Sequence, residues 1–214
     1  MAQKMGATDA ARRDMYMLLR ATEYNRDTDP ITPTERIHEA FYVFKHAKRG
    51  YEGDFEIKKD GCHSPSLERA IEEAVGSGEV VRDEFKAGAY WLTPSGIEAA
   101  EGPWRAAGLL ERTFASDAKD KMTGISDREL IAYLYGYFPR AWTDPGMRTK
   151  AGEWGFDAAC TLYERAKITI TEGARMSGMA YAEFMWAYSA TGRPLCTETT
   201  DDINRELGRI DRAG

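Results

Sequence analysis

Apolar residues recur every three to four positions through most of this chain, which is the spacing of amphipathic helices. The pattern is clear at residues 8–25 and stops at the turn-forming residues 25–30. It resumes behind Pro33, since proline suits the first turn of a helix, and ends at Gly50. This part of the chain is therefore predicted to form two helices, each with one buried face.

The spacing changes after the second predicted helix. Residues 55–57 alternate between apolar and polar side chains, which predicts a short extended segment, and residues 60–64 are predicted to form a loop. Ser64 is a good N-cap and Pro65 a good first helical residue, so a third helix is predicted from here to a glycine at position 76 or 78.

A β-hairpin is predicted next. Residues 80–82 and 90–92 are rich in β-branched and aromatic side chains and flank a polar, glycine-containing turn. A further helix is predicted to start at Thr93 and Pro94. The order helix, helix, strand, helix, hairpin, helix is that of a winged helix-turn-helix, with the third helix in the recognition position and the hairpin as the wing.

The second half of the chain is predicted to be helical. Residues 117–124 are polar and turn-rich and are the predicted linker, which divides the chain into domains at 1–116 and 117–214. Ser126 caps one clear helix, and residues 153–166 form another. The predicted fold class is mainly α with a small β wing, a winged helix-turn-helix followed by a C-terminal helical domain.

A second helix-turn-helix is predicted at residues 167–194. Thr171 is placed to cap a short first helix, and Ala174 lies where the two helices must approach closely. Gly178 lies where the turn needs a positive φ, which glycine adopts at little cost. The second helix is predicted to begin near Ala180, with a further short helix near the C-terminus.

The second helix of this motif has an unusual composition for a DNA reader, because it carries no Arg, Lys, Asn or Gln. Aromatic and methionine side chains are enriched at binding hot spots, which favours a partner interface that most simply makes a homodimer. The alternative is an internal helix packed between its neighbours. The predicted interface residues are Tyr181, Met185, Trp186 and Tyr188.

Composition narrows the function classes. At 214 residues with 43% hydrophobic residues, the chain can bury a substantial core. No apolar run approaches the roughly 18 residues of a membrane span, and the first residues lack a signal-peptide core, so a cytoplasmic protein without membrane contact is expected. The three cysteines are widely spaced, as expected of free thiols in a reducing compartment.

No catalytic motif is found, and neither catalytic residues, a cofactor nor a metal site is predicted. Phosphate-binding glycine loops and the H-E-x-x-H motif are absent from the sequence. Cys62 and His63 are the only adjacent Cys/His pair, whereas a structural zinc site needs four ligands at closer spacing. His38 and His63 show no partner in the sequence and are predicted to be structural or exposed.

Charge argues against indiscriminate nucleic-acid binding, because the net charge is −6 and such binding depends on lysine and arginine. The predicted recognition helix adds to this argument, since its outward positions hold three carboxylates and one arginine. A DNA reader presents Arg, Lys, Asn or Gln there. The predicted outward positions are Ser66, Glu68, Arg69, Glu72 and Glu73.

A local basic cluster could still hold duplex DNA by its phosphates without reading bases. It spans the end of the second predicted helix, the following strand, the recognition helix and the wing; the alternative is an ordinary charged surface. The predicted DNA-contacting residues are Lys45, Lys48, Arg49, Lys58, Lys59, Arg69, Arg82 and Lys86.

Residues 12–140 resemble a group of archaeal and bacterial winged-helix proteins and, more loosely, the Panacea-type antitoxin domain. That domain carries a Gly-Pro-Tyr-Ser-like stretch before its third helix, where this chain has Gly61-Cys62-His63-Ser64, without the proline and tyrosine. The residues that carry the resemblance are Pro30-Ile31, Arg36-Ile37-His38, Phe41, Phe55, Gly61, Ser64-Pro65-Ser66-Leu67, Tyr90-Trp91-Leu92-Thr93, Gly96 and Tyr135-Gly136-Tyr137-Phe138-Pro139.

Residues 158–207 resemble a family of small helix-turn-helix proteins that are presumed antitoxins of PIN-domain toxins. Both resemblances imply regulation by binding, to duplex DNA or to a protein such as a toxin, and neither supplies a catalytic residue. The expected function is a DNA-binding or antitoxin-like regulator, and the alternative is a protein-interaction adaptor on a winged-helix scaffold. The second resemblance rests on Leu162-Tyr163-Glu164-Arg165, Ile168, Ile170, Glu172-Gly173-Ala174, Ser177-Gly178-Met179, Glu183-Phe184-Met185 and Gly192-Arg193-Pro194.

Overall fold

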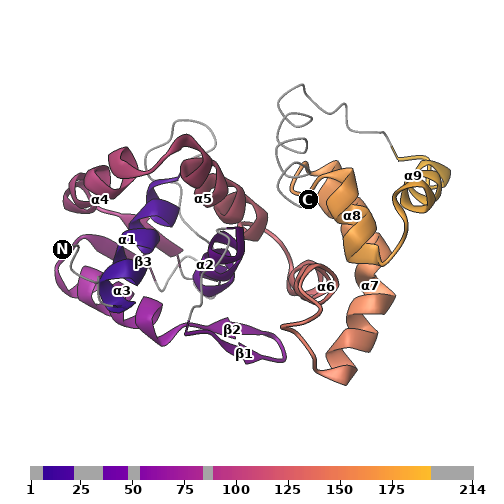
Figure 1. The fold of residues 1–214 in the computed structure, drawn as a ribbon, viewed down its shortest axis with the longest axis horizontal. Helices are drawn as coiled ribbons and strands as arrows, with labels where there is room; N and C mark the ends of the chain where they lie inside the picture. Colours follow the sequence, from indigo (N-terminus) through magenta and orange to yellow (C-terminus); the bar gives the residue numbers. More distant parts are fainter. Residues whose placement is uncertain (1–6, 22–35, 48–53, 84–88, 194–214) are drawn as a thin grey trace, which may run out of the picture. The chain divides into compact units, whose positions relative to one another are not determined.

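The computed structural model describes residues 7–21, 36–47, 54–83 and 89–193. In these ranges the protein is mainly helical with two small antiparallel sheets, which confirms the predicted combination of α structure and a little β structure (Figure 1). The chain divides into two compact units, residues 1–125 and 126–214. None of the described helices is long and apolar enough to cross a lipid bilayer.

The first unit is built around its first helix, which packs on α3, α4 and α5. The core is filled by fully buried apolar side chains such as Met15, Leu18 and Phe44. Its elements are α1 (Ala7–Arg20), α2 (Arg36–Ala47), β1 (Glu56–Lys58), β2 (Gly61–His63), α3 (Pro65–Gly76), β3 (Val80–Asp83), β4 (Ala89–Leu92), α4 (Pro94–Ala106) and α5 (Leu109–Met122).

Two hairpins flank α3. The predicted hairpin is confirmed: β3 and β4 are antiparallel, with Val80 opposite Leu92. The predicted loop at residues 60–64 is wrong, because part of it forms β2, which pairs with β1. The buried carboxylate of Glu39 accepts a hydrogen bond from the amide of Cys62 (3.2 Å), a contact that holds β2 against α2.

The start of α3 is as predicted and is reinforced from outside the helix. The hydroxyl oxygen of Ser64 accepts a hydrogen bond from the amide of Leu67 (3.2 Å). The carboxylate of Asp54 accepts hydrogen bonds from the hydroxyl of Ser64 (2.6 Å) and from the amide of Ser66 (2.7 Å). Burial alone would raise the pKa of Asp54, but these hydrogen bonds outweigh it and hold that pKa below its usual value.

The predicted linker at 117–124 is wrong in most of its length, and the predicted boundary after residue 116 falls inside a helix. Residues 117–122 are the last turns of α5, and the division between the units lies after Ile125. The ammonium group of Lys119 is buried and donates hydrogen bonds to the carbonyl oxygens of Leu19 (3.1 Å) and Ala21 (2.7 Å). Lys119 therefore caps the C-terminal end of α1.

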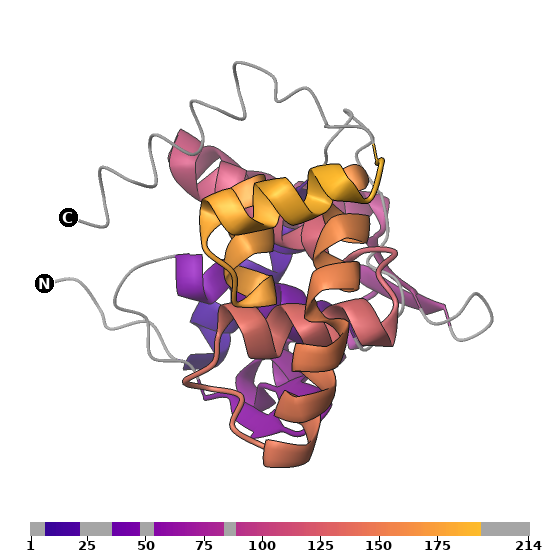
Figure 2. The same ribbon diagram turned by 90° about the vertical axis from the view of Figure 1, so that its right-hand side faces the viewer.

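The second unit is a bundle of four described helices (Figure 2). Ser126 caps the first of them as predicted, in a reciprocal capping box with Glu129. The predicted helix at 153–166 begins earlier, since Asp144 caps it and Pro145 is its first residue. The helices are α6 (Asp127–Tyr137), α7 (Pro145–Glu164), α8 (Ile170–Ser177) and α9 (Tyr181–Ala190).

Helices α8 and α9 are joined by a tight turn. Gly178 has φ +71°, which confirms the prediction of a positive φ, whereas the cap of α8 is Thr169 and not Thr171. Phe184 is fully buried and packs back on α8. The point of close approach is Gly173 rather than Ala174, since a Cβ atom on Gly173 would lie 2.8 Å from the Phe184 ring.

The backbone at the end of α8 lies close to two glycines of neighbouring helices. A Cβ atom on Gly136 of α6 would lie 2.4 Å from the carbonyl oxygen of Met176, and one on Gly155 of α7 would lie 3.3 Å from the same oxygen. Both helices therefore approach the backbone of α8 at positions without a side chain.

Candidate functional site

The exposed face of α3 is acidic. Glu72 and Glu73 are exposed, Glu68 is partly exposed, and Arg69 is the basic residue among them. The guanidinium of Arg69 donates a hydrogen bond to the hydroxyl of Thr8 at the start of α1 (3.3 Å). Carboxylates thus dominate the surface of this helix, which opposes contact with phosphates.

Ser66 was predicted to face outward with these residues, and that prediction is wrong. Its side chain is buried, and its hydroxyl donates a hydrogen bond to the carboxylate of Asp54 (2.9 Å).

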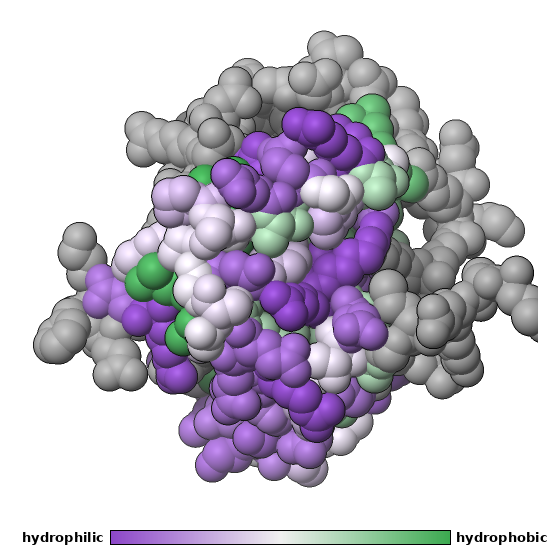
Figure 3. Space-filling model, turned by 90° about the vertical axis from the view of Figure 1, so that its left-hand side faces the viewer, coloured by the Kyte–Doolittle hydropathy of each residue, from purple (hydrophilic) through white to green (hydrophobic). Residues whose placement is uncertain are grey.

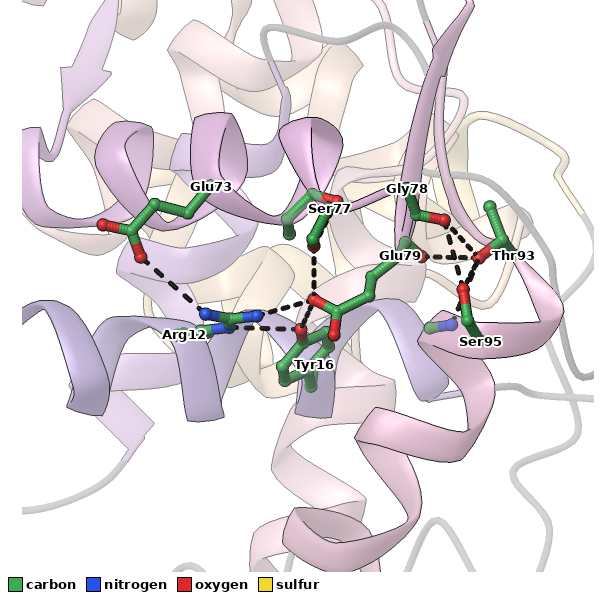
Figure 4. Close-up of polar contacts among 10 residues, drawn as sticks. Arg12, Tyr16, Glu73, Ser77, Gly78, Glu79, Thr93 and Ser95 are labelled. Atoms are coloured by element: carbon green, nitrogen blue, oxygen red, sulfur yellow. Dashed lines mark hydrogen bonds and ion pairs between the residues drawn. The ribbon is translucent and has the colours of Figure 1, made fainter.

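A polar network fixes the C-terminal end of α3 to α1 (Figure 4). The guanidinium of Arg12 contacts the carboxylates of Glu73 (3.8 Å) and Glu79 (2.6 Å). Tyr16 and Ser77 donate hydrogen bonds to the same Glu79 carboxylate (2.5 and 2.9 Å). The bond from Tyr16 is the main cause that lowers the pKa of Glu79. These contacts fix the position of α3 against α1, and every polar group named here has its partner inside the first unit.

Lys45 was predicted to contact DNA, and this prediction is wrong. Its side chain is 2% exposed, and its ammonium group forms an ion pair with the buried carboxylate of Asp14 on α1. Arg13 contacts the other oxygen of Asp14 (2.8 Å) and also binds Glu111 on α5. The ammonium of Lys45 is part of the core that joins α1 to α2 and is out of reach of a phosphate.

Four predicted DNA-contacting residues are exposed but lie on separate elements. Lys58 and Lys59 are at the turn of the β1–β2 hairpin, Arg69 is on α3, and Arg82 is on β3, with its guanidinium over the Tyr90 ring (5.8 Å). Lys48, Arg49 and Lys86 lie outside the described residues. The face of the first unit that shows α3 and α4 is mostly hydrophilic (Figure 3).

The predicted aromatic patch on α9 is only partly exposed. Trp186 is 75% exposed and Tyr181 52%, whereas Met185 is half-buried. Tyr188 is fully buried between the rings of Tyr163 and Phe184, at ring-centroid distances of 5.1 and 6.2 Å. The prediction that Tyr188 belongs to an interface is therefore wrong, because the residue is part of the core of the second unit.

Three residues that could hold a metal ion come together from α2, β2 and α3. The Nε2 atom of His38 lies 3.0 Å from a carboxylate oxygen of Glu68, and the ring centroids of His38 and His63 are 4.8 Å apart. Both histidines are partly buried and His38 is bonded to Glu68, which agrees with the predicted structural role, although the sequence did not reveal these neighbours. Sequence reasoning missed this site because His38 is 25 positions before His63 and 30 before Glu68, which matches no ligand spacing.

The described cysteines, Cys62 and Cys160, are buried free thiols. Burial raises the pKa of both thiols, so they remain protonated at neutral pH. Both thiols are buried, whereas an activated nucleophilic cysteine is partly exposed.

Comparison of the chain with protein-family models, with curated proteins and with solved structures gave no match. Inferences about function therefore rest on the geometry of the two units.

Proposed function

We propose that this chain is a non-catalytic regulatory protein of the winged-helix type that acts by binding another protein rather than by reading a DNA sequence. The observation that carries the proposal is the acidic exposed face of α3, with Glu72 and Glu73 exposed beside Glu68. A recognition helix that enters the major groove presents donors for base edges and avoids carboxylates facing phosphates.

The winged-helix part of the proposal is supported by the order and packing of the first unit. Helix α3 packs on α1 and leads directly into the β3–β4 hairpin, which occupies the position of a wing. Arg12 and its partners hold the far end of α3 in place. A helix held this firmly, with the exposed side chain of Glu72 on its outer face, suits rigid docking of a partner.

DNA binding is the second candidate, favoured by the exposed positions of Lys58, Lys59 and Arg82 on the two hairpins. These side chains could contact phosphates without sequence readout. This candidate predicts affinity for any duplex, with a steep loss as the salt concentration rises.

The test uses a random-sequence duplex and fluorescence anisotropy across a salt series. The unmodified chain is expected to show no binding, because net charge −6 and the carboxylates of α3 repel the duplex. Glu72→Lys together with Glu73→Lys is expected to create salt-dependent binding. Salt-sensitive binding by the unmodified chain that Lys58→Glu with Lys59→Glu abolishes would instead establish the DNA-binding candidate.

We further propose that the outer face of α9 pairs with a second copy of the chain. Among its ten residues α9 has a single charged one, Glu183, which lies in the first turn. Antiparallel pairing of two such helices about a two-fold axis keeps the two carboxylates apart and covers the exposed side chain of Trp186.

Tyr181→Ala with Trp186→Ala is expected to weaken self-association at least about tenfold, because truncation of a hot-spot aromatic typically costs 2 kcal/mol or more. Sedimentation equilibrium gives the dissociation constant. The matched control is Leu109→Ala, which removes an 81% exposed apolar side chain from the first unit and should leave the equilibrium unchanged. An unmodified chain that stays monomeric at every concentration would contradict the pairing.

A further inference from the structure

The two histidines of the cluster His38, His63 and Glu68 have no role in the proposed function, whereas Glu68 lies at the edge of the acidic face of α3. Its members come from three elements: His38 from α2, His63 from the end of β2, and Glu68 from the first turn of α3. The side chain of His38 is 12% exposed and that of Glu68 is 35% exposed, so the cluster lies near the surface.

We propose that these three residues bind a single divalent transition-metal ion of the zinc type. Two imidazoles and one carboxylate are a common ligand set for zinc, whereas calcium and magnesium take oxygen ligands. Ligand atoms around a tetrahedral zinc ion lie about 3.3 Å apart. His38 Nε2 and the Glu68 oxygen are 3.0 Å apart, and a ligand atom of His63 lies within 4.8 Å of both. Binding therefore requires the half-buried ring of His63 to move toward the other two ligand atoms, and water would fill the fourth position.

The metal competes with a hydrogen-bonded arrangement of the same residues. The Nδ1 atom of His38 accepts a hydrogen bond from the amide of Ser64 (3.2 Å), which leaves the imidazole proton on Nε2, facing Glu68. An ion bound to Nε2 takes the place of that proton, which moves to Nδ1 through solvent, and the hydrogen bond from Ser64 is lost. No proton is gained or lost overall by the ring.

Metal binding is therefore coupled to the cap of α3. Ser64 is the N-cap residue of that helix, and its amide loses its acceptor when the ion binds. The ion also ties α3 to α2 and β2 through three bonds in place of two hydrogen bonds. The bound ion thus acts on the position of the helix whose outer face carries the proposed function, although the site itself does not depend on that function.

Zn²⁺ is titrated into the full chain by isothermal calorimetry, and Co²⁺ absorption reports whether a thiolate is a ligand. The expected result is one ion per chain, a Co²⁺ spectrum without thiolate charge transfer, and a shift of the Ser64 amide resonance. His63→Ala is expected to weaken binding at least tenfold, because loss of an outer-shell partner already costs about 10- to 100-fold.

Two variants separate metal binding from a structural role. Glu68→Gln keeps an oxygen that can accept the hydrogen bond from His38, but this amide oxygen is a poor zinc ligand. The variant should therefore fold normally and bind Zn²⁺ at least tenfold more weakly. His46→Ala removes the third histidine of the chain, whose ring stacks on Tyr42. This variant should bind Zn²⁺ with the affinity of the unmodified chain. Absence of binding by the unmodified chain, or equal affinity of all variants, overturns the proposal.

Discussion

Asp14→Ala is expected to lower the free energy of unfolding of the first unit by about 3–5 kcal/mol, the usual cost of removing one partner of a buried ion pair. Lys45 would keep its ammonium group in the core, 2% exposed, without the carboxylate that faces it. Hydrogen exchange followed by mass spectrometry localises the effect, and loss of protection should be concentrated in α1, α2 and α5.

The double variant Asp14→Leu with Lys45→Met is the decisive comparison. Replacement of both charges by apolar side chains of similar size is often close to neutral, so this variant should recover most of the lost stability. Arg105→Ala is the surface control, because it breaks an ion pair whose arginine is 81% exposed, and its unfolding midpoint should not move. If Asp14→Ala is as stable as the unmodified chain, the ammonium group of Lys45 must reach solvent.

Gly136→Ala is expected to destabilise the second unit by about 2–3 kcal/mol. The new Cβ atom would lie 2.4 Å from the carbonyl oxygen and 2.9 Å from the Cα atom of Met176. These are backbone atoms of α8, which cannot rotate away as a flexible side chain can, so α6 and α8 must separate. Urea unfolding gives the change in free energy, and hydrogen exchange shows whether it is confined to α6–α9.

Gly152→Ala is the matched control for this substitution. Gly152 is also inside a helix of the second unit, but a Cβ atom there meets nothing within 4 Å. The change is expected to stabilise the unit by about 0.5–1 kcal/mol, because alanine loses less conformational freedom than glycine in a helix. Equal effects at positions 136 and 152 would mean that α6 and α8 are not in close contact.

Features with a local cause could be predicted from the sequence. The cap at Ser64 and the capping box at Ser126 are made by residues within three positions of one another. The positive φ at Gly178 is likewise a property of one turn, and the β3–β4 hairpin joins neighbouring segments. In each case the stabilising contact lies within a few residues of the pattern that predicts it.

Features that depend on distant residues were missed or misassigned. Lys45 and Lys119 were taken for surface or linker residues because lysine is mostly exposed. Their partners are on α1, 31 and about 100 positions away. Tyr188 was misplaced for a related reason, since helical spacing shows which residues share a face but not that Tyr163 covers it. The cluster of His38, His63 and Glu68 was invisible because only the folded chain brings its elements together.

The close approach of α8 to Gly136 and Gly155 limits which residues of this bundle can be substituted. Gly136 and Gly155 set the course of α8 by contacts with its backbone, and Phe184 fixes α9 on Gly173. The outward side chains of α9, Tyr181 and Trp186, take no part in these contacts. Substitutions at these two positions therefore leave the scaffold unchanged, so related chains should differ more on this face than at the two glycines.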